Sequence, residues 1–560
     1  MKRKWLLIAI MAMLMLFFAA CGRGGGGVRT RPDHWEGDTV FYPQTFTAWD
    51  GWSTGAGVQW HDTEVGRLIQ EITGITIQME FNVGASAEER AALIIASGDF
   101  PDIILPWHAF DAFRDAGALI PLNDLFDRYA PNIQALWGDS VNRTLDPDTG
   151  IMWGIANMSY GTPPMAFPTA GFYMRASVAA ANDWRVFTDP DDFFDAIRRY
   201  VAENPYNSQG QSNIGFTGPS EGWRFVFTLH GGNRLHGWHN TGDFVYDPNN
   251  NWRAQSTCIF PPRRDYLLRL WELNQEGLLD PEMLSQSHDE YVAKIASGRV
   301  VAFYDETWQV NQAFNLIAED NRPMDLFIPM PIVYGNIPDT YMGIAAVTPR
   351  PALSITTAAR DPEAIIMFVD FLASEEMLTL RYWGIEGVHY QRNAAGRRYL
   401  TREQYAERDV PGWSDRTGVG MHMGSPGPMQ LAAERPDGSG VWSPAYDPAR
   451  AQFIYSDAHL YVLGHLGWDR FVDPFAPMWR SPYGFGWDIN VPPDNDFLVD
   501  LQHNFNLLDS HIVYQRMIMA ADRAEFDSHW NTFIERVEAL NIQPLLDFRE
   551  EEVRRRVREW

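Results

Sequence analysis

The hydrophobic and polar positions near the start of the folded chain alternate between two periods. A β-rich run at 39–46 is followed by an amphipathic segment, 61–74, with apolar residues every three or four positions. Residues 75–83 alternate with period two, 86–98 again have helical spacing, and 100–105 form a short apolar run. Strands that alternate with helices predict a parallel sheet with crossover helices.

The same pattern returns further along the chain. We predict helices within 191–205 and 264–277, and a helix, a turn and a buried strand within 291–308. A long helix is expected within 361–387. The C-terminal third is predicted to be rich in loops and aromatic residues until an amphipathic segment begins at about residue 528. The pattern therefore predicts two α/β regions.

The N-terminus has the features of an export signal. A cationic head at residues 2–4 precedes 16 apolar residues, 5–20, which is shorter than the roughly 20 needed for a membrane-spanning helix. The residues before Cys21 resemble a bacterial lipoprotein cleavage site. We therefore expect a signal peptide at 1–20, and a lipidated Cys21 followed by a flexible Gly-rich tether, 21–34. A plain signal peptide with an incidental cysteine is the alternative.

Composition narrows the functional classes. The formal net charge of the 560-residue chain is −27, which disfavours binding to nucleic acid. Besides Cys21 the chain has only Cys258, so we expect no internal disulfide and a packed thiol at that position. The 22 tryptophans often lie beside Asp, Asn, Gly or His, as in "AWDGW" (48–52) and "DETWQ" (305–309). Aromatic side chains among polar neighbours suit a sugar ring.

Six blocks of sequence, in order, resemble family 1 extracellular solute-binding proteins of ABC importers. The resemblance extends over roughly residues 35–400, and the branch is that of the long sugar-binding lipoproteins related to maltose-binding protein. The blocks are 61–80, 92–105, 117–133, 274–283, 294–308 and 361–390.

The resemblance implies a two-lobe, periplasmic-binding-protein-like α/β fold of type II, with a hinge that the chain crosses more than once. Lobe 1 would comprise 35–157 plus about 342–385, and lobe 2 would comprise 158–341 plus about 386–560 with a C-terminal extension. The lobes would close on the ligand. We expect a monomer, anchored by lipid to the outer face of the cell membrane, with ABC permease subunits as its partners.

The loop that follows the buried strand at 100–105 is a candidate ligand site. Ligands of parallel sheets bind at the carboxyl ends of strands, which places Trp107, His108 and Asp111 at such a site. In the related proteins this turn supplies a stacking Trp and polar groups, so the resemblance assigns the same roles here. The alternative for Trp107 is an aromatic side chain packed under a loop.

The resemblance also indicates residues outside that loop. Trp308 takes the position of a second stacking Trp on the opposite lobe, with Asp305 as an acceptor for sugar hydroxyls. Asp50 and Trp52 follow the first strand and are further candidates. Arg175 matches a position where the family usually has Arg. A salt bridge within the lobe and a contact with the ligand are equally consistent with the sequence at this position.

Other functional classes are less consistent with the sequence. Glycoside hydrolases also carry Trp and paired carboxylates, but the adjacent Asp305 and Glu306 point to opposite sides of an extended segment. The chain has no GxSxG, HExxH or Walker motif, so we predict no enzyme and no cofactor. Segment 494–500 begins like a calcium loop, but Val499 and Phe505 replace its Gly and Glu, so we predict no metal. A sensor receptor or a surface adhesin without transport stays open.

Overall fold

The computed structural model describes most of the chain from residue 43 onward. The described residues are 43–53, 57–146, 149–159, 166–168, 170–236, 244–247, 250–259, 261–335, 347–408, 410, 412–420, 430–431, 441–444, 447, 451–475, 489–492 and 495–559. The predicted signal peptide, Cys21 and the tether lie outside these residues. The chain divides into two compact units, and it passes from one to the other three times. Unit 1 comprises Met1–Ser159 and Val347–Pro444, and unit 2 comprises Tyr160–Ala346 and Ala445–Trp560.

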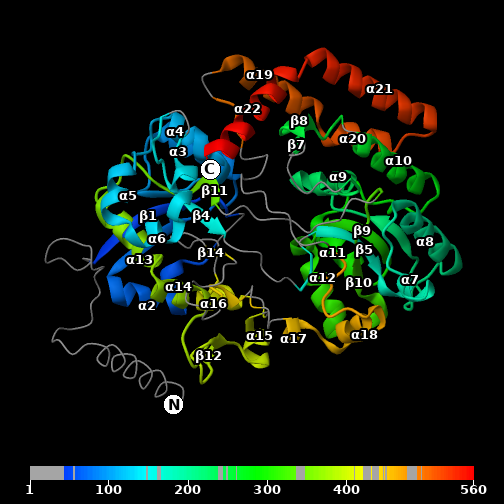
Figure 1. Cartoon of the computed structure of the whole chain (residues 1–560), viewed down its shortest axis with the longest axis horizontal. Coiled ribbons are helices and arrows are strands. Elements are labelled where there is room, and N and C mark those ends of the chain that lie inside the picture. Colours follow the sequence, from blue (N-terminus) through cyan, green and yellow to red (C-terminus); the bar gives the residue numbers. More distant parts are fainter. Residues whose placement is uncertain are drawn as a thin grey trace. The chain divides into compact units, whose positions relative to one another are not determined.

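Unit 1 is built on a six-stranded sheet with the order β14-β4-β11-β3-β1-β2 (Figure 1). β1 is parallel to both β2 and β3, as the alternating pattern predicts, so the carboxyl ends of these three strands share one edge. β11 is antiparallel to β3 and β4. The strands are β1 (Gln44–Asp50), β2 (Ile75–Glu80), β3 (Ile103–Leu105), β4 (Ile155–Ser159), β11 (Val347–Ile355) and β14 (Gln430–Leu431).

The first helices of unit 1 begin and end where the sequence indicates. Ser86 and Glu89 form a capping box at the start of α3 (Ala87–Ser97). α2 (Glu64–Thr73) ends at Gly74, whose φ of 71° is the left-handed conformation that Gly adopts without strain. The other helices of this unit are α4 (Phe110–Asp115), α5 (Asn123–Tyr129), α6 (Pro131–Trp137), α13 (Pro362–Leu372), α14 (Glu375–Tyr382), α15 (Arg402–Arg408) and α16 (Trp413–Thr417), with the short hairpin β12 (Gln391–Arg392) and β13 (Arg398–Tyr399).

Unit 2 is built on a four-stranded sheet with the order β10-β5-β9-β6. Every residue of β9 is buried, and the side chains of its first five residues, 300–304, belong to the hydrophobic core. β6 is parallel to β9, whereas β5 is antiparallel to it. The elements are β5 (Ala170–Arg175), α7 (Ala176–Ala181), α8 (Pro190–Glu203), β6 (Ile214–Thr217), η4 (Gly222–Arg224), α9 (Phe225–Arg234), β7 (Phe244–Asp247), β8 (Arg253–Ser256), α10 (Pro261–Gln275), α11 (His288–Ala296), β9 (Val300–Glu306), α12 (Thr307–Glu319), η6 (Pro323–Asp325) and β10 (Phe327–Met330).

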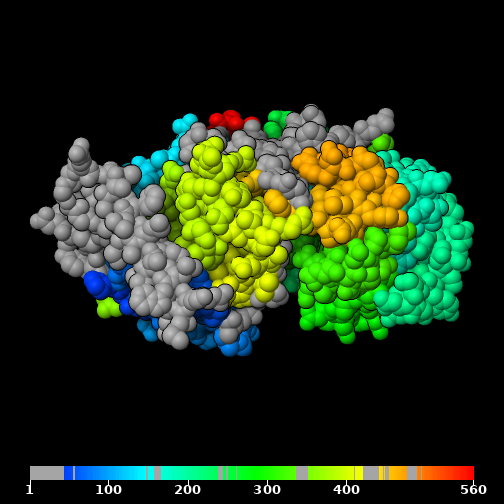
Figure 2. All heavy atoms as spheres, turned by 90° about the horizontal axis from the view of Figure 1, so that it is seen from below, coloured from blue at the N-terminus to red at the C-terminus, as the bar shows by residue number. Residues whose placement is uncertain are grey.

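The C-terminal third is more helical than the sequence suggested. Between residues 451 and 522 the structure has helices where we predicted loops, because Ser456 and Asn495 act as N-caps and apolar side chains such as Phe505 enter the core of unit 2. Figure 2 shows α18, in orange, over the green segment that contains α12. The helices are α17 (Ala451–Ile454), α18 (Asp457–Leu466), α19 (Asp496–Leu508), α20 (His511–Ile518), α21 (Arg523–Leu540) and α22 (Gln543–Glu559).

Two further features differ from the sequence interpretation. The helix expected within 361–387 is interrupted, because the Ser374 side chain accepts a hydrogen bond from the N–H of Met377 and starts α14 as a separate helix. Residues 386–444 belong to unit 1, whereas we expected lobe 2 to resume at about 386. Described residues of this segment contact α2: Arg416 pairs with Glu64 at 2.6 Å, and His389 lies 3.5 Å from the same carboxylate.

The described helices include none that is long and apolar enough to span a bilayer. Of the segment 494–500, which resembles the start of a calcium loop, Asp494 lies outside the described residues; Asn495 caps α19, and Val499 and Phe505 are both helical. Among the described residues no three His, Cys, Asp or Glu side chains are grouped so as to hold a metal ion. Cys258 is buried, and its Sγ atom lies 2.9 Å from the hydroxyl oxygen of Ser256.

Candidate functional site

In unit 1, the chain following β1 makes a tight turn beside the end of β3. The backbone N–H of Gly51 donates to the carbonyl of Leu105 at 3.0 Å, and a Cβ at position 51 would lie 2.8 Å from that oxygen. Only Gly therefore fits this approach. The Asp50 carboxylate is 1% exposed and accepts the N–H of Trp52 at 2.9 Å, which stabilises the turn, and Trp52 is half-buried.

The predicted loop after β3 forms a short 3-10 helix, η2 (Trp107–Ala109), followed by α4. His108 is exposed, and Asp111 pairs with Arg114 of the same helix at 2.9 Å. The side chain of Trp107 lies outside the described part. Because β1 and β3 pair in register, with Asp50 opposite Leu105, the structure brings the Asp50 turn and the His108 turn to one edge of the sheet.

In unit 2, two large indoles lie exposed beside the carboxyl end of β9. Trp308, in the first turn of α12, is 52% exposed, and Trp223, in η4, is 58% exposed. Their ring centroids are 6.0 Å apart and their planes differ by 16°. The rings of Phe227 and Trp308 are nearly perpendicular, at 85°, and their centroids are 5.8 Å apart. Trp223, Phe227 and Trp308 form what we call the aromatic patch.

Arg224 lies within the aromatic patch. Its guanidinium carbon is 4.7 Å from the centroid of Trp223 and 5.8 Å from that of Trp308, both within cation–π range. It donates one hydrogen bond, from Nη1 to Oε1 of Gln309, at 2.5 Å. Burial lowers the pKa of Arg224, although Asp305, Glu221 and Asp289 act in the opposite direction.

Asp305 lies behind the aromatic patch and does not reach solvent. Its carboxylate accepts hydrogen bonds from the hydroxyl of Tyr291 at 3.0 Å, Nε2 of Gln309 at 2.5 Å and the N–H of Glu306 at 2.7 Å. Burial raises its pKa to about 7, against the lowering effect of these three hydrogen bonds. The carboxylate thus orients the Gln309 amide, which in turn orients Arg224.

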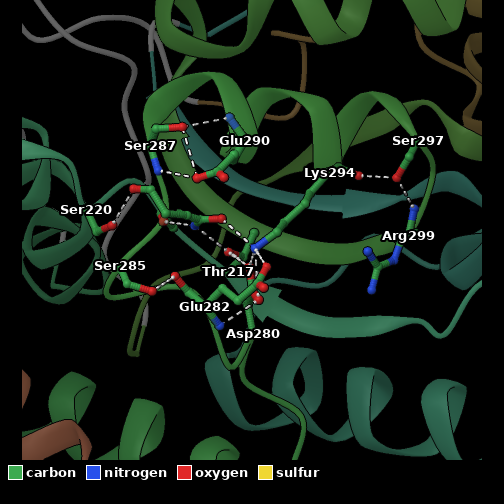
Figure 3. A network of polar contacts seen from close by, with 12 residues as sticks. Thr217, Ser220, Asp280, Glu282, Ser285, Ser287, Glu290, Lys294, Ser297 and Arg299 are labelled. Carbon is green, nitrogen blue, oxygen red and sulfur yellow. Dashed lines mark hydrogen bonds and ion pairs between the residues drawn. The ribbon is translucent and has the colours of Figure 1, made fainter.

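A polar network fastens the chain that carries Trp223 (Figure 3). Lys294 of α11 donates to Asp280 at 2.9 Å and to Oε1 of Gln286 at 2.9 Å. The Gln286 Nε2 atom then donates to the carbonyl of Gly218, directly after β6, at 3.0 Å. Lys294 is the only lysine after residue 4, and it is buried.

The same network continues toward η4. The hydroxyl of Ser220 donates to the carbonyl of Gln286 at 3.3 Å, and the Glu221 carboxylate accepts the N–H of His288 at 2.8 Å. Asp280 also accepts a hydrogen bond from Thr217, the last residue of β6, at 3.0 Å. The segment between β6 and η4 is therefore held at several points, and the position of Trp223 depends on them.

Arg175 lies away from the aromatic patch. It ends β5, which is antiparallel to β9, so it lies near the start of β9, whereas Asp305 lies near its end. The side chain is 2% exposed and donates to Ser177 at 2.8 Å, to Asn213 at 3.0 Å and to the carbonyl of Gly298. These contacts tie β5 to the turn before β9.

Trp223 and Arg224 were not identified from the sequence. A signal was nonetheless present, because "EGWRF" (221–225) places a Trp between Gly and Arg beside a Glu, the kind of polar context in which the other candidate tryptophans lie. The proximity of this segment to Trp308 becomes visible only in the fold, since 85 residues separate Arg224 from its partner Gln309.

Solved structures of solute-binding proteins resemble the chain over nearly its whole length. An alginate-binding protein, crystallised without calcium ion, is 16% identical with a TM-score of 0.63, covering 93% of this chain and 100% of that one. The ABC-transporter substrate-binding protein FusA of S. pneumoniae, as an EF-hand mutant with fructo-nystose, is 14% identical with a TM-score of 0.66 (91% and 99% covered). An HMO-binding solute-binding protein from Bifidobacterium longum infantis is 13% identical with a TM-score of 0.64 (91% and 98% covered). No curated protein sequence matches.

A family model supports the same assignment. The model described as bacterial extracellular solute-binding protein matches residues 68–378, more than half of the 560-residue chain. This match confirms the family that the sequence blocks indicated, and the prediction of a binding protein rather than an enzyme. The likeness to the solved structures confirms the two-lobe, periplasmic-binding-protein-like α/β fold class. The chain belongs to the family of bacterial extracellular solute-binding proteins.

Proposed function

We propose that the protein binds an oligosaccharide on the aromatic patch of unit 2 and delivers it to an ABC importer. The observation that carries this proposal is the exposure of two nearly parallel indoles, Trp223 and Trp308, beside the end of a buried strand. Large exposed aromatic side chains present apolar surface to water. A ligand that covers this surface removes it from water, which contributes favourably to the free energy of binding. A pyranose ring offers the flat C–H face that an indole covers well.

The polar groups around the aromatic patch suit the rest of a sugar. A guanidinium has five N–H donors, and Arg224 uses one of them on Gln309, which leaves donors for sugar oxygens. The groups beside the aromatic patch are held in place. Asp305 fixes the side chain of Gln309, and the Lys294 network fixes the segment before η4. Such pre-organisation reduces the entropy that binding costs.

The edge of unit 1 supplies further candidate contacts. We propose that Trp52, Trp107, His108 and Asp111 are a second set of candidate sugar contacts, within unit 1 alone, because they follow strand ends that share one sheet edge. Asp50 acts within this set by fixing the turn that carries Trp52. Arg175 is left out of the proposed site, since its guanidinium is buried among protein acceptors at the far end of the other sheet.

We further propose that Cys21 carries lipid and tethers the protein to the outer face of the cell membrane. The proposal rests on the cationic head, the apolar run 5–20 and the Gly-rich segment after Cys21. Replacing Cys21→Ala in cells should move the protein from the membrane fraction into the soluble exported fraction. Continued membrane association of the Cys21→Ala protein would contradict the anchor.

The binding function is tested by a thermal-shift screen against plant, bacterial and host oligosaccharides, followed by calorimetry of each hit. A saturating ligand at about 100 times its Kd should stabilise the protein by roughly 2.7 kcal/mol, which is visible as a raised melting temperature. The absence of any oligosaccharide that binds would reject the proposal. A sensor receptor would bind the same sugars, so growth on the identified sugar after deletion of the gene separates import from sensing.

A further inference from the structure

The guanidinium of Arg224 makes no direct contact with a carboxylate in the described part of the protein. Elsewhere in unit 2, Arg264 pairs with Asp527 at 2.6 Å and Arg198 pairs with Glu276 at 2.7 Å. Arg224 has no carboxylate within ion-pair distance among the described residues, and its hydrogen-bond partner is the neutral amide of Gln309.

The nearby acids are engaged in other contacts. Asp305 is fully buried and its oxygens accept from Tyr291, Gln309 and the backbone, and its pKa of about 7 reduces its charge at neutral pH. Glu221 accepts the backbone N–H of His288. Asp289, in the first turn of α11, is the third acid close enough to influence Arg224. None of the three neutralises the guanidinium by direct contact.

The position of the guanidinium is defined. Gln309 is 3% exposed, with its amide nitrogen on Asp305 and its amide oxygen on Arg224, so its orientation is fixed. The two indoles bound the guanidinium at 4.7 and 5.8 Å. A planar guanidinium with free N–H donors, held beside exposed aromatic rings, matches the geometry of a carboxylate, which accepts two parallel hydrogen bonds.

We propose that the ligand is an acidic oligosaccharide, in which a sugar carboxylate of the uronic or sialic acid type binds Arg224 while its ring covers the adjoining indole surface. This inference rests on the proposed function and names the ligand class of the same site. A carboxylate attached to the ring lies beside the ring rather than over its face, so one sugar residue satisfies both contacts. Arg224 then determines specificity for charge, and the aromatic patch supplies apolar contact.

The experiment compares acidic oligosaccharides with their neutral counterparts. Short oligogalacturonates, oligomannuronates and sialyllactose are each titrated beside the same compound with its carboxylates reduced to alcohols. At least one acidic compound should bind about tenfold or more tightly than its reduced form, because charge-assisted hydrogen bonds are roughly twice as strong as neutral ones. Its affinity should also fall as salt rises, since the contact is half-exposed.

Variants assign the effect to one residue. Arg224→Gln should weaken the acidic compound about tenfold or more and change the reduced compound less than about threefold. Arg224→Lys keeps the charge but loses the paired donors, so its affinity for the acidic compound should lie between those of the wild-type protein and of Arg224→Gln. Arg264→Gln removes an arginine that is paired with Asp527 outside the patch, and it should leave both affinities unchanged.

The outcomes separate the two proposals. If neutral oligosaccharides bind as well as acidic ones, or if Arg224→Gln weakens both forms equally, the acidic-ligand inference is wrong and the oligosaccharide function stands. If no oligosaccharide of either kind binds to the folded wild-type protein, both proposals fail. If an acidic compound binds but Arg224→Gln leaves its affinity unchanged, the charge is recognised elsewhere and the assignment to Arg224 is overturned.

Discussion

Replacing Trp308→Ala should weaken ligand binding much more than it weakens the fold. A Trp side chain has roughly 250 Å² of surface, so the 52% exposure of Trp308 leaves about 130 Å² accessible in the free protein. A sugar that covers half to all of this surface gains about 1.6–3.2 kcal/mol at ~25 cal/mol per Å². The alanine variant should therefore raise Kd roughly 15- to 200-fold.

The effect on folding should be smaller. The covered half of Trp308 contacts the buried Phe227 and also Trp223, which is itself exposed and is able to close part of the gap. We expect the free energy of unfolding to fall by about 1–2 kcal/mol, which is near the average for a point substitution, because about half of the side chain is packed. Trp49→Ala offers the contrast, because Trp49 is 0% exposed and its loss should cost about 3–5 kcal/mol.

The measurement combines calorimetric affinity for the identified oligosaccharide with urea unfolding of the free protein. Phe497→Ala is the matched control, since Phe497 is an equally exposed aromatic residue, at 62%, on α19 of unit 2. It should leave Kd unchanged. The reasoning is refuted if Trp308→Ala binds normally while its unfolding free energy drops by about 3–5 kcal/mol, as a core residue would behave.

Three further substitutions test the supporting structure by urea unfolding. Lys294→Met should lower the free energy of unfolding by about 3–5 kcal/mol, because the buried Asp280 carboxylate loses its cationic partner and Oε1 of Gln286 loses its donor; a loss below about 1 kcal/mol would contradict the role given to Lys294. Arg416→Ala removes an exposed pair with Glu64 and should change stability by less than about 1 kcal/mol. Asp305 has a raised native pKa of about 7, so the native state binds the extra proton and wild-type stability falls as pH rises from about 4 to 7. Asp305→Asn should remove the part of this pH-dependent loss of stability that Asp305 causes, up to roughly 4 kcal/mol. The part caused by Asp370, whose pKa is raised to a similar value, should remain. An unchanged pH dependence would show that Asp305 is not the titrating group.

The order of elements in the first α/β region was predictable because local signals agree there. The capping box of Ser86 and the Gly74 C-cap fix helix ends, and the period of the hydrophobic pattern distinguishes strand from helix. The helices between residues 451 and 522 were missed, because their aromatic and polar composition resembles that of loops until the core of unit 2 is known.

The candidate site was predictable only in part, for a different reason. A Trp among polar residues after a strand marks an exposed aromatic, which located Trp308. The role of Asp305 depends on Tyr291 and Gln309, which reach its carboxylate only in the folded chain. Arg175 likewise has the sequence context of a site residue, but its acceptors come from segments distant in sequence. Tertiary contacts, rather than local pattern, decide between ligand contact and internal support.

Hydroxyl-radical footprinting of the wild-type protein, with and without saturating oligosaccharide, tests the central claim most directly. Oxidation of each Trp is quantified by mass spectrometry, and the exposed indoles of Trp223 and Trp308 should react rapidly in the free protein. Both should be protected when the ligand is bound, while the exposed Phe497 reacts at an unchanged rate. If Trp223 and Trp308 stay equally reactive at saturating ligand, the sugar does not bind on the aromatic patch.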